Sequence, residues 1–224
     1  MNEKILRLFS RQSPVSVLGP GQRAVIRVQG CRFACKYCIV PESWDESAGE
    51  LVSLAEMAAW VLAQPGIEGI TFSGGEPMLQ ANALADLIDL VQAKADLGVV
   101  CYTGYRLEQL QQQGTQEQQE LLQRIDLLID GVYIEQQHAD LLWRGSANQR
   151  LLPMTERYQA LIIEQLAQGR SVGLQFFMET TGEIQFVGIP KQPGFRQEFE
   201  SRMLSRGVIM KPVKEVILNS QKFS

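Results

Sequence analysis

The sequence has little that would suit it to a nucleic acid, a membrane or secretion. Its 224 residues carry 21 Lys and Arg against 25 Asp and Glu, so the basic excess typical of nucleic-acid-binding proteins is absent. Uncharged stretches such as residues 57–67 are far shorter than the roughly 18 apolar residues of a membrane span. Residues 1–13 lack the apolar segment and small-residue cleavage site of a signal peptide. We therefore expect a soluble, cytoplasmic protein with no nucleic-acid or membrane partner.

Histidine and cysteine are also scarce, with one histidine and four cysteines. Cys31, Cys35 and Cys38 fall within one short segment, whereas Cys101 stands alone. A secreted disulfide framework would spread an even number of cysteines along a shorter chain. The clustering therefore indicates a metal site or redox chemistry. We expect Cys101 to be a small core residue, and His138 to be a surface or packing residue because no partner pattern surrounds it.

The chain length suits one large domain, or one domain with an appendage. Strands alternate with helices in the first two thirds, which predicts parallel βαβ units and an α/β fold. We expect a core over residues 1–155 and a small C-terminal extension of helix, hairpin and helix over residues 156–224. The predicted strands cover residues 24–29, 69–72, 99–102 and part of 125–134, with helices over 53–63, 81–94 and 107–123 and a break near Gly114. The extension is predicted to contain helices over residues 155–168 and 194–205, flanking a hairpin over 172–178 and 183–189.

The spacing Cys31-x3-Cys35-x2-Cys38 brings three thiols together in a loop that follows a predicted strand. Thiolates are soft ligands that select zinc, copper(I) or an iron–sulfur cluster. Structural zinc takes four closed ligands, and the remaining candidates, Cys101 and His138, lack paired spacing. A four-iron cluster held by three cysteines leaves one iron open to a substrate. The pattern favours the cluster, and zinc is the alternative.

Residues 30–38 (GCRFACKYC) resemble the signature of the radical S-adenosylmethionine (SAM) superfamily, in which an aromatic residue, here Tyr37, precedes the third cysteine. Residues 19–23 (GPGQR) and 41–45 (PESWD) are similar to the activating enzymes of glycyl radical enzymes. Residues 102–105 (YTGY), the pair Asp130-Gly131 and residues 143–150 resemble the activating proteins of anaerobic ribonucleotide reductases. The resemblance covers about residues 15–155.

This resemblance implies a partial, open βα barrel in which Cys31, Cys35 and Cys38 hold a [4Fe–4S] cluster. The amino and carboxylate groups of SAM would chelate the fourth iron. One electron from an external donor such as flavodoxin or ferredoxin would then cleave SAM to methionine and a 5′-deoxyadenosyl radical, which abstracts hydrogen from a polypeptide. The protein's part is to place and shield the cluster.

The candidate SAM-binding residues follow the predicted strands, where open α/β sheets bind ligands. Two glycines at such a point permit close backbone approach, although a plain strand-to-helix turn is the alternative. Arg144 is a candidate partner for the SAM carboxylate, with a surface ion pair as the alternative. By similarity, Tyr37 lies against the adenine, Gly74, Gly75 and Glu76 hold the methionine amino group, and Thr103, Tyr105 and Asp130 line the cavity.

Two features depart from the resemblance. Activating enzymes often carry His-Asn or Tyr-Asn after the third cysteine, whereas Ile39-Val40 follow it here and make that edge apolar. The extension, residues 156–224, has no counterpart in the reductase activators.

Because of these two differences, the sequence is compatible with two kinds of polypeptide substrate. The resemblance favours an activase that abstracts hydrogen from a glycine of a large glycyl radical enzyme. The alternative is an enzyme of splicease or epimerase type that modifies a ribosomally made precursor peptide, with the extension binding the peptide or a small accessory recognition protein. A non-enzymatic zinc or iron–sulfur scaffold is disfavoured by the candidate SAM-binding residues.

Overall fold

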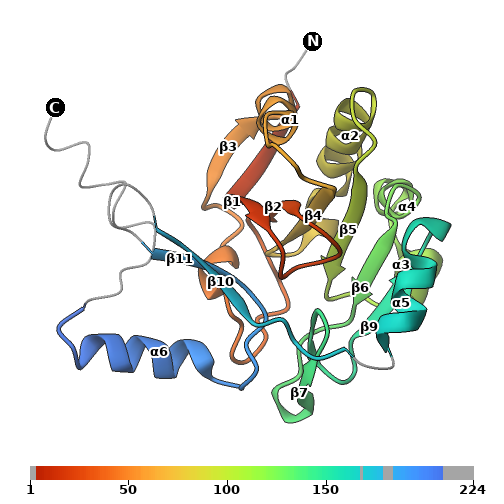
Figure 1. The fold of residues 1–224 in the computed structure, drawn as a ribbon. Coiled ribbons are helices and arrows are strands. Elements are labelled where there is room, and N and C mark those ends of the chain that lie inside the picture. The colour runs from red at the N-terminus through yellow and green to blue at the C-terminus, as the bar shows by residue number, and fades with distance from the viewer. Residues whose placement is uncertain (1–3, 167–168, 179–183, 209–224) are drawn as a thin grey trace, which may run out of the picture.

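The computed structural model describes residues 4–166, 169–178 and 184–208. Its centre is a seven-stranded mixed sheet in the order β3-β1-β2-β4-β5-β6-β9 (Figure 1). This arrangement confirms the α/β class predicted from the sequence. No helix of the described residues is long and apolar enough to cross a membrane.

Four central strands run parallel, as their alternation with helices predicts. Helices follow β4 and β5 where apolar residues recur at helical spacing. A further helix follows residues 50–53, and Ser53 caps it by accepting a hydrogen bond from the Glu56 amide (3.1 Å). The parallel strands are β2 (Arg23–Val28), β4 (Gly69–Gly74), β5 (Gly98–Thr103) and β6 (Leu127–Asp130). The helices are α1 (Leu54–Leu62), α2 (Ala81–Gln92), α3 (Leu107–Gln113) and α4 (Gln116–Leu122), with a 3₁₀ turn η2 (Pro77–Gln80) before α2.

The outer strands are antiparallel and were not predicted. β1 (Ile5–Val15) pairs with both β2 and β3 (Glu50–Ser53), and β9 (Arg150–Pro153) pairs with β6. A short separate ribbon joins β7 (His138–Leu141) to β8 (Arg144–Ser146). β1 cannot be predicted from its sequence, because its polar side chains and Pro14 interrupt the period-two alternation of a half-buried strand.

The two faces of the sheet are covered differently. Ala24, Ile26 and Val28 point into the core between the sheet and the helices, whereas Val25 on the opposite face packs with Val187 of the extension. Residues 159–166 form α5 (Gln159–Leu166) after a 3₁₀ turn η4 (Glu156–Tyr158), beside β9. The predicted helix over 155–168 is thus found in part, and residues 167–168 lie outside the described residues.

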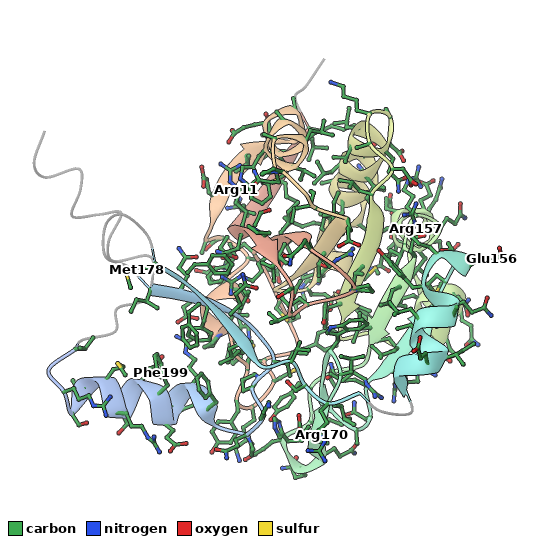
Figure 2. All side chains as sticks on the ribbon, viewed as in Figure 1. Arg11, Glu156, Arg157, Arg170, Met178 and Phe199 are labelled. Carbon is green, nitrogen blue, oxygen red and sulfur yellow. The ribbon has the colours of Figure 1, made fainter. Side chains whose placement is uncertain are left out.

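The rest of the extension is the hairpin β10 (Leu174–Met178) and β11 (Ile184–Gly188), followed by α6 (Phe195–Leu204). Both elements were predicted, although residues 179–183 between the strands lie outside the described residues. Four phenylalanines join the hairpin to α6, with Phe195 and Phe199 stacked 5.5 Å apart; the other two are Phe176 and Phe186. Figures 1 and 2 show α6 far from α1 and α2, with Phe199 on the side of α6 that faces the hairpin.

Candidate active site

A cavity lies where the cysteine loop meets the ends of the central strands. Its walls come from several parts of the chain that are distant in sequence, including the segment between β6 and β9, which contributes Gly131–Tyr133, His138, Gly145 and Gln149. The loop contributes Phe33, Tyr37 and the three clustered cysteines, the strand ends contribute Arg27, Ser73–Glu76 and Tyr102–Gly104, and the extension contributes much of the segment 186–196. Parallel strands present their ends at one edge of the sheet, which is where the sequence pattern placed the site.

The cysteine loop is fixed by its own backbone. The amide of Gly30 donates to the Ser43 carbonyl (2.7 Å), and the Cys31 amide donates to the Trp44 carbonyl (3.0 Å). Ala34 and Tyr37 adopt left-handed φ angles of 47° and 60°, which turn the chain sharply between the cysteines. As a result Cys31, Cys35 and Cys38 all line the cavity as free thiols.

The chemistry of this donor set fits an iron–sulfur cluster. Burial raises the pKa of Cys31 to about 11 and also raises the pKa values of Cys35 and Cys38. Thiolate ligands therefore need a strong positive charge beside them, which iron supplies. Within the described ranges no three His, Cys, Asp or Glu side chains converge on a point that suits a single metal ion. A cluster binds each thiolate at a different iron, so it does not require that convergence.

The predicted glycine turn packs directly on the start of the cysteine loop. The Gly75 amide donates to the Val28 carbonyl (2.8 Å), and the Glu76 amide donates to the Gly30 carbonyl (2.7 Å). A Cβ at position 75 would lie 2.3 Å from the Gly30 carbonyl oxygen, so only glycine permits this approach. Gly74 has a φ of 97°. These contacts hold the glycine turn against the cysteine loop, so the two predicted parts of the site lie side by side.

Glu76 lies buried at the base of this turn. Its carboxylate accepts hydrogen bonds from the Thr103 hydroxyl (2.8 Å), the Gly104 amide (2.7 Å) and the Met78 amide (2.9 Å). Burial raises the pKa of Glu76 to about 7, against the opposing effect of these three donors. The carboxylate therefore also caps η2, and the turn serves a local structural role as well as lining the cavity. The structure brings Glu76 and Thr103 together as the sequence pattern implied.

The other predicted SAM-binding residues divide into two groups. Tyr37 lines the cavity, with the Lys36 ammonium 5.0 Å from its ring centroid. Tyr105 lies behind the lining, where its ring packs edge-to-face on Phe33 at 5.0 Å. Tyr105 therefore supports a wall of the cavity.

Asp130 and Arg144 are not among the residues that line the cavity, although Gly131 and Gly145, which follow them in the chain, are. The fully buried Asp130 carboxylate accepts from Arg150 Nε (2.9 Å) and from the Leu107 amide (2.9 Å), and pairs with Arg106. Arg144 donates to the carbonyls of Leu142 and Gln149, each at 3.4 Å. Asp130 thereby ties β6 to the start of α3, and Arg144 braces its own turn.

Sequence reasoning missed several lining residues. Arg27 is buried on β2, where it reads as the exposed polar residue of an alternating strand. The only signal for the 186–196 segment was its Pro and Gly content after the hairpin. His138 lies on β7, lines the cavity and contacts the Tyr133 hydroxyl through Nδ1 (3.1 Å). Cys101 is fully buried in the core, as predicted.

The chain resembles proteins of known families over most of this core. A family model described as a 4Fe-4S single cluster domain matches residues 17–152, more than half of the chain. The anaerobic ribonucleoside-triphosphate reductase-activating protein of Enterobacteria phage T4 is 34% identical over 146 residues, which cover 62% of this chain and 89% of that protein.

Two further relatives extend the comparison. The protein of the same name from Vibrio cholerae is 38% identical over 152 residues, covering 63% of this chain and 94% of its own. The pyruvate formate-lyase-activating enzyme of Clostridium pasteurianum is 31% identical over 128 residues, covering 55% and 50%. The hairpin and α6 lie beyond the span of the family model. The chain belongs to the 4Fe-4S single cluster domain family and is a radical SAM enzyme of the activating type, with a [4Fe–4S] cluster and SAM as its cofactors.

Proposed function

We propose that this chain activates an anaerobic ribonucleoside-triphosphate reductase by abstracting a hydrogen atom from a glycine of that enzyme. One observation carries the proposal: the three clustered cysteines and the buried Glu76–Thr103 pair face one cavity. The names of the relatives that match this same region support it.

The residues of the cavity divide the work. Cys31, Cys35 and Cys38 hold the cluster, which supplies the electron for reductive cleavage of SAM. Glu76, fixed by three donors, offers its carboxylate to the amino group of SAM beside the glycine turn. Tyr37 offers its ring to the adenine. Val40 and the aromatic side chains of the lining keep bulk water from the cluster.

The fold suits a polypeptide substrate. We regard the sheet as the partial barrel of the radical SAM type, with residues 1–155 as its core and residues 156–224 as the extension. The helices cover one face of the sheet, and the cavity opens on the other side between the strand ends and the extension. An external electron donor such as flavodoxin or ferredoxin, and a cytoplasmic location, remain predictions.

The cofactor chemistry has a direct test. Anaerobic reconstitution with iron and sulfide is expected to give a brown protein that converts SAM to 5′-deoxyadenosine in the presence of dithionite. Cys35→Ala is expected to abolish this conversion, because it removes one of three ligands. A colourless protein that takes up zinc and leaves SAM intact would overturn the proposal.

The substrate has a separate test. The reconstituted protein is mixed with SAM, dithionite and a purified anaerobic ribonucleoside-triphosphate reductase, and the glycyl radical is measured by electron paramagnetic resonance. A radical signal that depends on all components is the expected result. Absence of the radical, together with transfer of deuterium from a Cα-deuterated precursor peptide to 5′-deoxyadenosine, would favour the peptide-modifying alternative.

A further inference from the structure

Arg27 is a buried cation on the face of the sheet opposite the helices, called the inner face below. Its neighbours Ile26 and Val28 point into the helix-covered core, so the alternation of β2 directs Arg27 to the other face. There it is 7% exposed and lines the cavity beside Ser73, its partner in the parallel register of β2 and β4. The Arg27 side chain therefore belongs to the wall between the glycine turn and the extension.

The guanidinium of Arg27 is held in place by uncharged groups. Its Nε donates to the Ser10 hydroxyl (2.7 Å), and its Nη1 donates to the Phe186 carbonyl (3.3 Å). The guanidinium carbon lies 5.1 Å from the centroid of the Phe9 ring. These contacts from β1 and β11 fix the plane of the group and leave Nη2 without a hydrogen-bond partner among the described residues.

No carboxylate of the described chain lies within ion-pair distance of Arg27. The acidic group whose charge acts on Arg27 is Glu42, and that carboxylate is already paired with Arg196. Burial lowers the pKa of Arg27 to about 10, which shows the cost of removing this cation from water. Arginine is well suited to bind carboxylates, because its planar N–H groups match two carboxylate oxygens.

We propose that Arg27 and Ser73 bind a carboxylate of the polypeptide substrate, either an Asp or Glu side chain or a chain end close to the reacting residue. This inference rests on the proposed function, because it assumes that a polypeptide enters the cavity. SAM also carries a carboxylate, which the resemblance assigns to the open iron of the cluster. Arg27 is held by Ser10 and Phe186, and both residues lie outside the span of the family model. These contacts of Arg27 are therefore not part of the region that the family model describes.

Two short peptides test the proposal. Acetyl-Gly-Gly-Glu-Gly-amide and acetyl-Gly-Gly-Gln-Gly-amide differ only in the charged group. Binding of each to the reconstituted protein with SAM is measured anaerobically by equilibrium dialysis. We expect the acidic peptide to bind about tenfold more tightly, in keeping with a charge-assisted hydrogen bond. Equal binding of the two peptides, or binding of neither, would overturn the proposal.

Three variants test whether Arg27 and Ser73 cause the preference for the acidic peptide. Arg27→Gln is expected to remove the preference for the acidic peptide, and Ser73→Ala to reduce it. Arg11→Gln is the matched control, since Arg11 is on neighbouring β1 but pairs with Glu56 and lies over Trp60, away from the cavity (Figure 2). Circular dichroism verifies the fold of each variant. If Arg27→Gln does not fold, the wild-type peptide comparison and Ser73→Ala decide the matter.

A measurement of SAM binding distinguishes the carboxylate of SAM from a carboxylate of the peptide as the ligand of Arg27. The SAM affinity of the Arg27→Gln variant is expected to stay within about twofold of wild type. If Arg27 bound the SAM carboxylate, loss of that charged hydrogen bond would weaken SAM binding about tenfold. Loss of SAM affinity with an unchanged peptide preference would place SAM on Arg27 and overturn the proposal. Failure of the proposed function shows differently, as absence of 5′-deoxyadenosine from the wild-type protein.

Discussion

Among single residues, Glu76 links the stability of the site to pH. Its pKa of about 7 lies above the ordinary 4.5, so between these values the folded protein binds a proton that the unfolded chain releases. The contribution of Glu76 to stability is therefore greatest below about pH 4.5 and declines as pH rises to about 7. The three hydrogen bonds to its carboxylate limit this decline.

Thr103→Val removes one of those donors, and it is expected to lower the free energy of unfolding by about 1–2 kcal/mol near pH 5.5. Loss of a donor to the ionised carboxylate raises the pKa of Glu76 further, so the loss is expected to be larger near pH 8.5. Urea denaturation at the two pH values measures it. An equal loss at both would contradict the assigned role of Thr103.

Gly75→Ala is expected to push the glycine turn away from the cysteine loop, because the new methyl group would overlap the Gly30 carbonyl. We expect a cost of about 1–3 kcal/mol and a lower iron content after reconstitution. Gly66→Ala is the control for backbone strain without a steric clash: its φ of 68° disfavours alanine, and its Cβ would meet nothing within 4 Å. An equal loss of iron in both variants would contradict the role of the close contact between Gly75 and Gly30.

Sequence reasoning located the residues that are marked by a local pattern, and it gave no information on contacts that depend on the fold. The cysteine spacing and the glycine turn are continuous in the chain, so the pattern located both. Asp130 and Arg144 were placed at the cavity by resemblance, but their partners come from α3, β9 and the adjoining turn. Arg27 was missed because a strand pattern does not show that the extension covers its polar face.

At the level of elements, the predicted helices and central strands agree with the structure to within a few residues. Their signals are local: apolar spacing, a serine cap and β-branched runs. The edge strands β1, β3 and β9 lacked such signals. Their pairing depends on neighbours that lie far away in the sequence, such as Gln12 of β1 opposite Val25 of β2.

An ion pair joins the start of α6 to the cysteine loop, in addition to the phenylalanine contacts with the hairpin. Arg196 pairs with Glu42 and donates to the Ile39 carbonyl (3.1 Å), so it joins the start of α6 to the loop just after Cys38. Both side chains of this pair are largely buried, at 18% and 17% exposure. Nearby positive charge from Arg196 and its hydrogen bond lower the pKa of Glu42 despite its burial.

Arg196→Gln is expected to destabilise the docked extension by about 1–3 kcal/mol, because it leaves Glu42 without its partner in a half-buried place. Hydrogen exchange of α6 amides measures the effect and should become faster. Arg202→Gln, which breaks an exposed pair with Glu198 on the same helix, should leave exchange near the wild-type rate. Similar exchange in both variants would rule out a special role for Arg196.

For the molecule as a whole, the hairpin of the extension packs on the face of the sheet that the helices leave uncovered. Val187 is 3% exposed and packs with Val15, Val17, Leu18 and Val25 on the inner face of the sheet. Arg27 and Gln12 also contact the hairpin, through the Phe186 carbonyl and Gln185 respectively. A sequence boundary near residue 155 therefore does not separate two independent apolar cores.

Val187→Asp is expected to detach the hairpin, since it places an unpaired charge in this apolar cluster at a cost of about 3 kcal/mol or more. Binding of a hydrophobic dye should rise as the inner face becomes exposed. Ile184→Asp on the same strand is the control, because Ile184 is already 51% exposed. Dye binding that rises equally in both variants would contradict the packing role of Val187.

The contact between Arg196 and Glu42 spans 154 residues of sequence, and this separation sets an order of events during synthesis. The parallel strands β2, β4, β5 and β6 all lie within residues 23–130 and can pair before the extension has left the ribosome. The cysteine loop then stands open on that side until residues 186–196 arrive to cover it. We therefore expect the cysteine loop to be most accessible to iron and sulfide before residues 186–196 have folded over it.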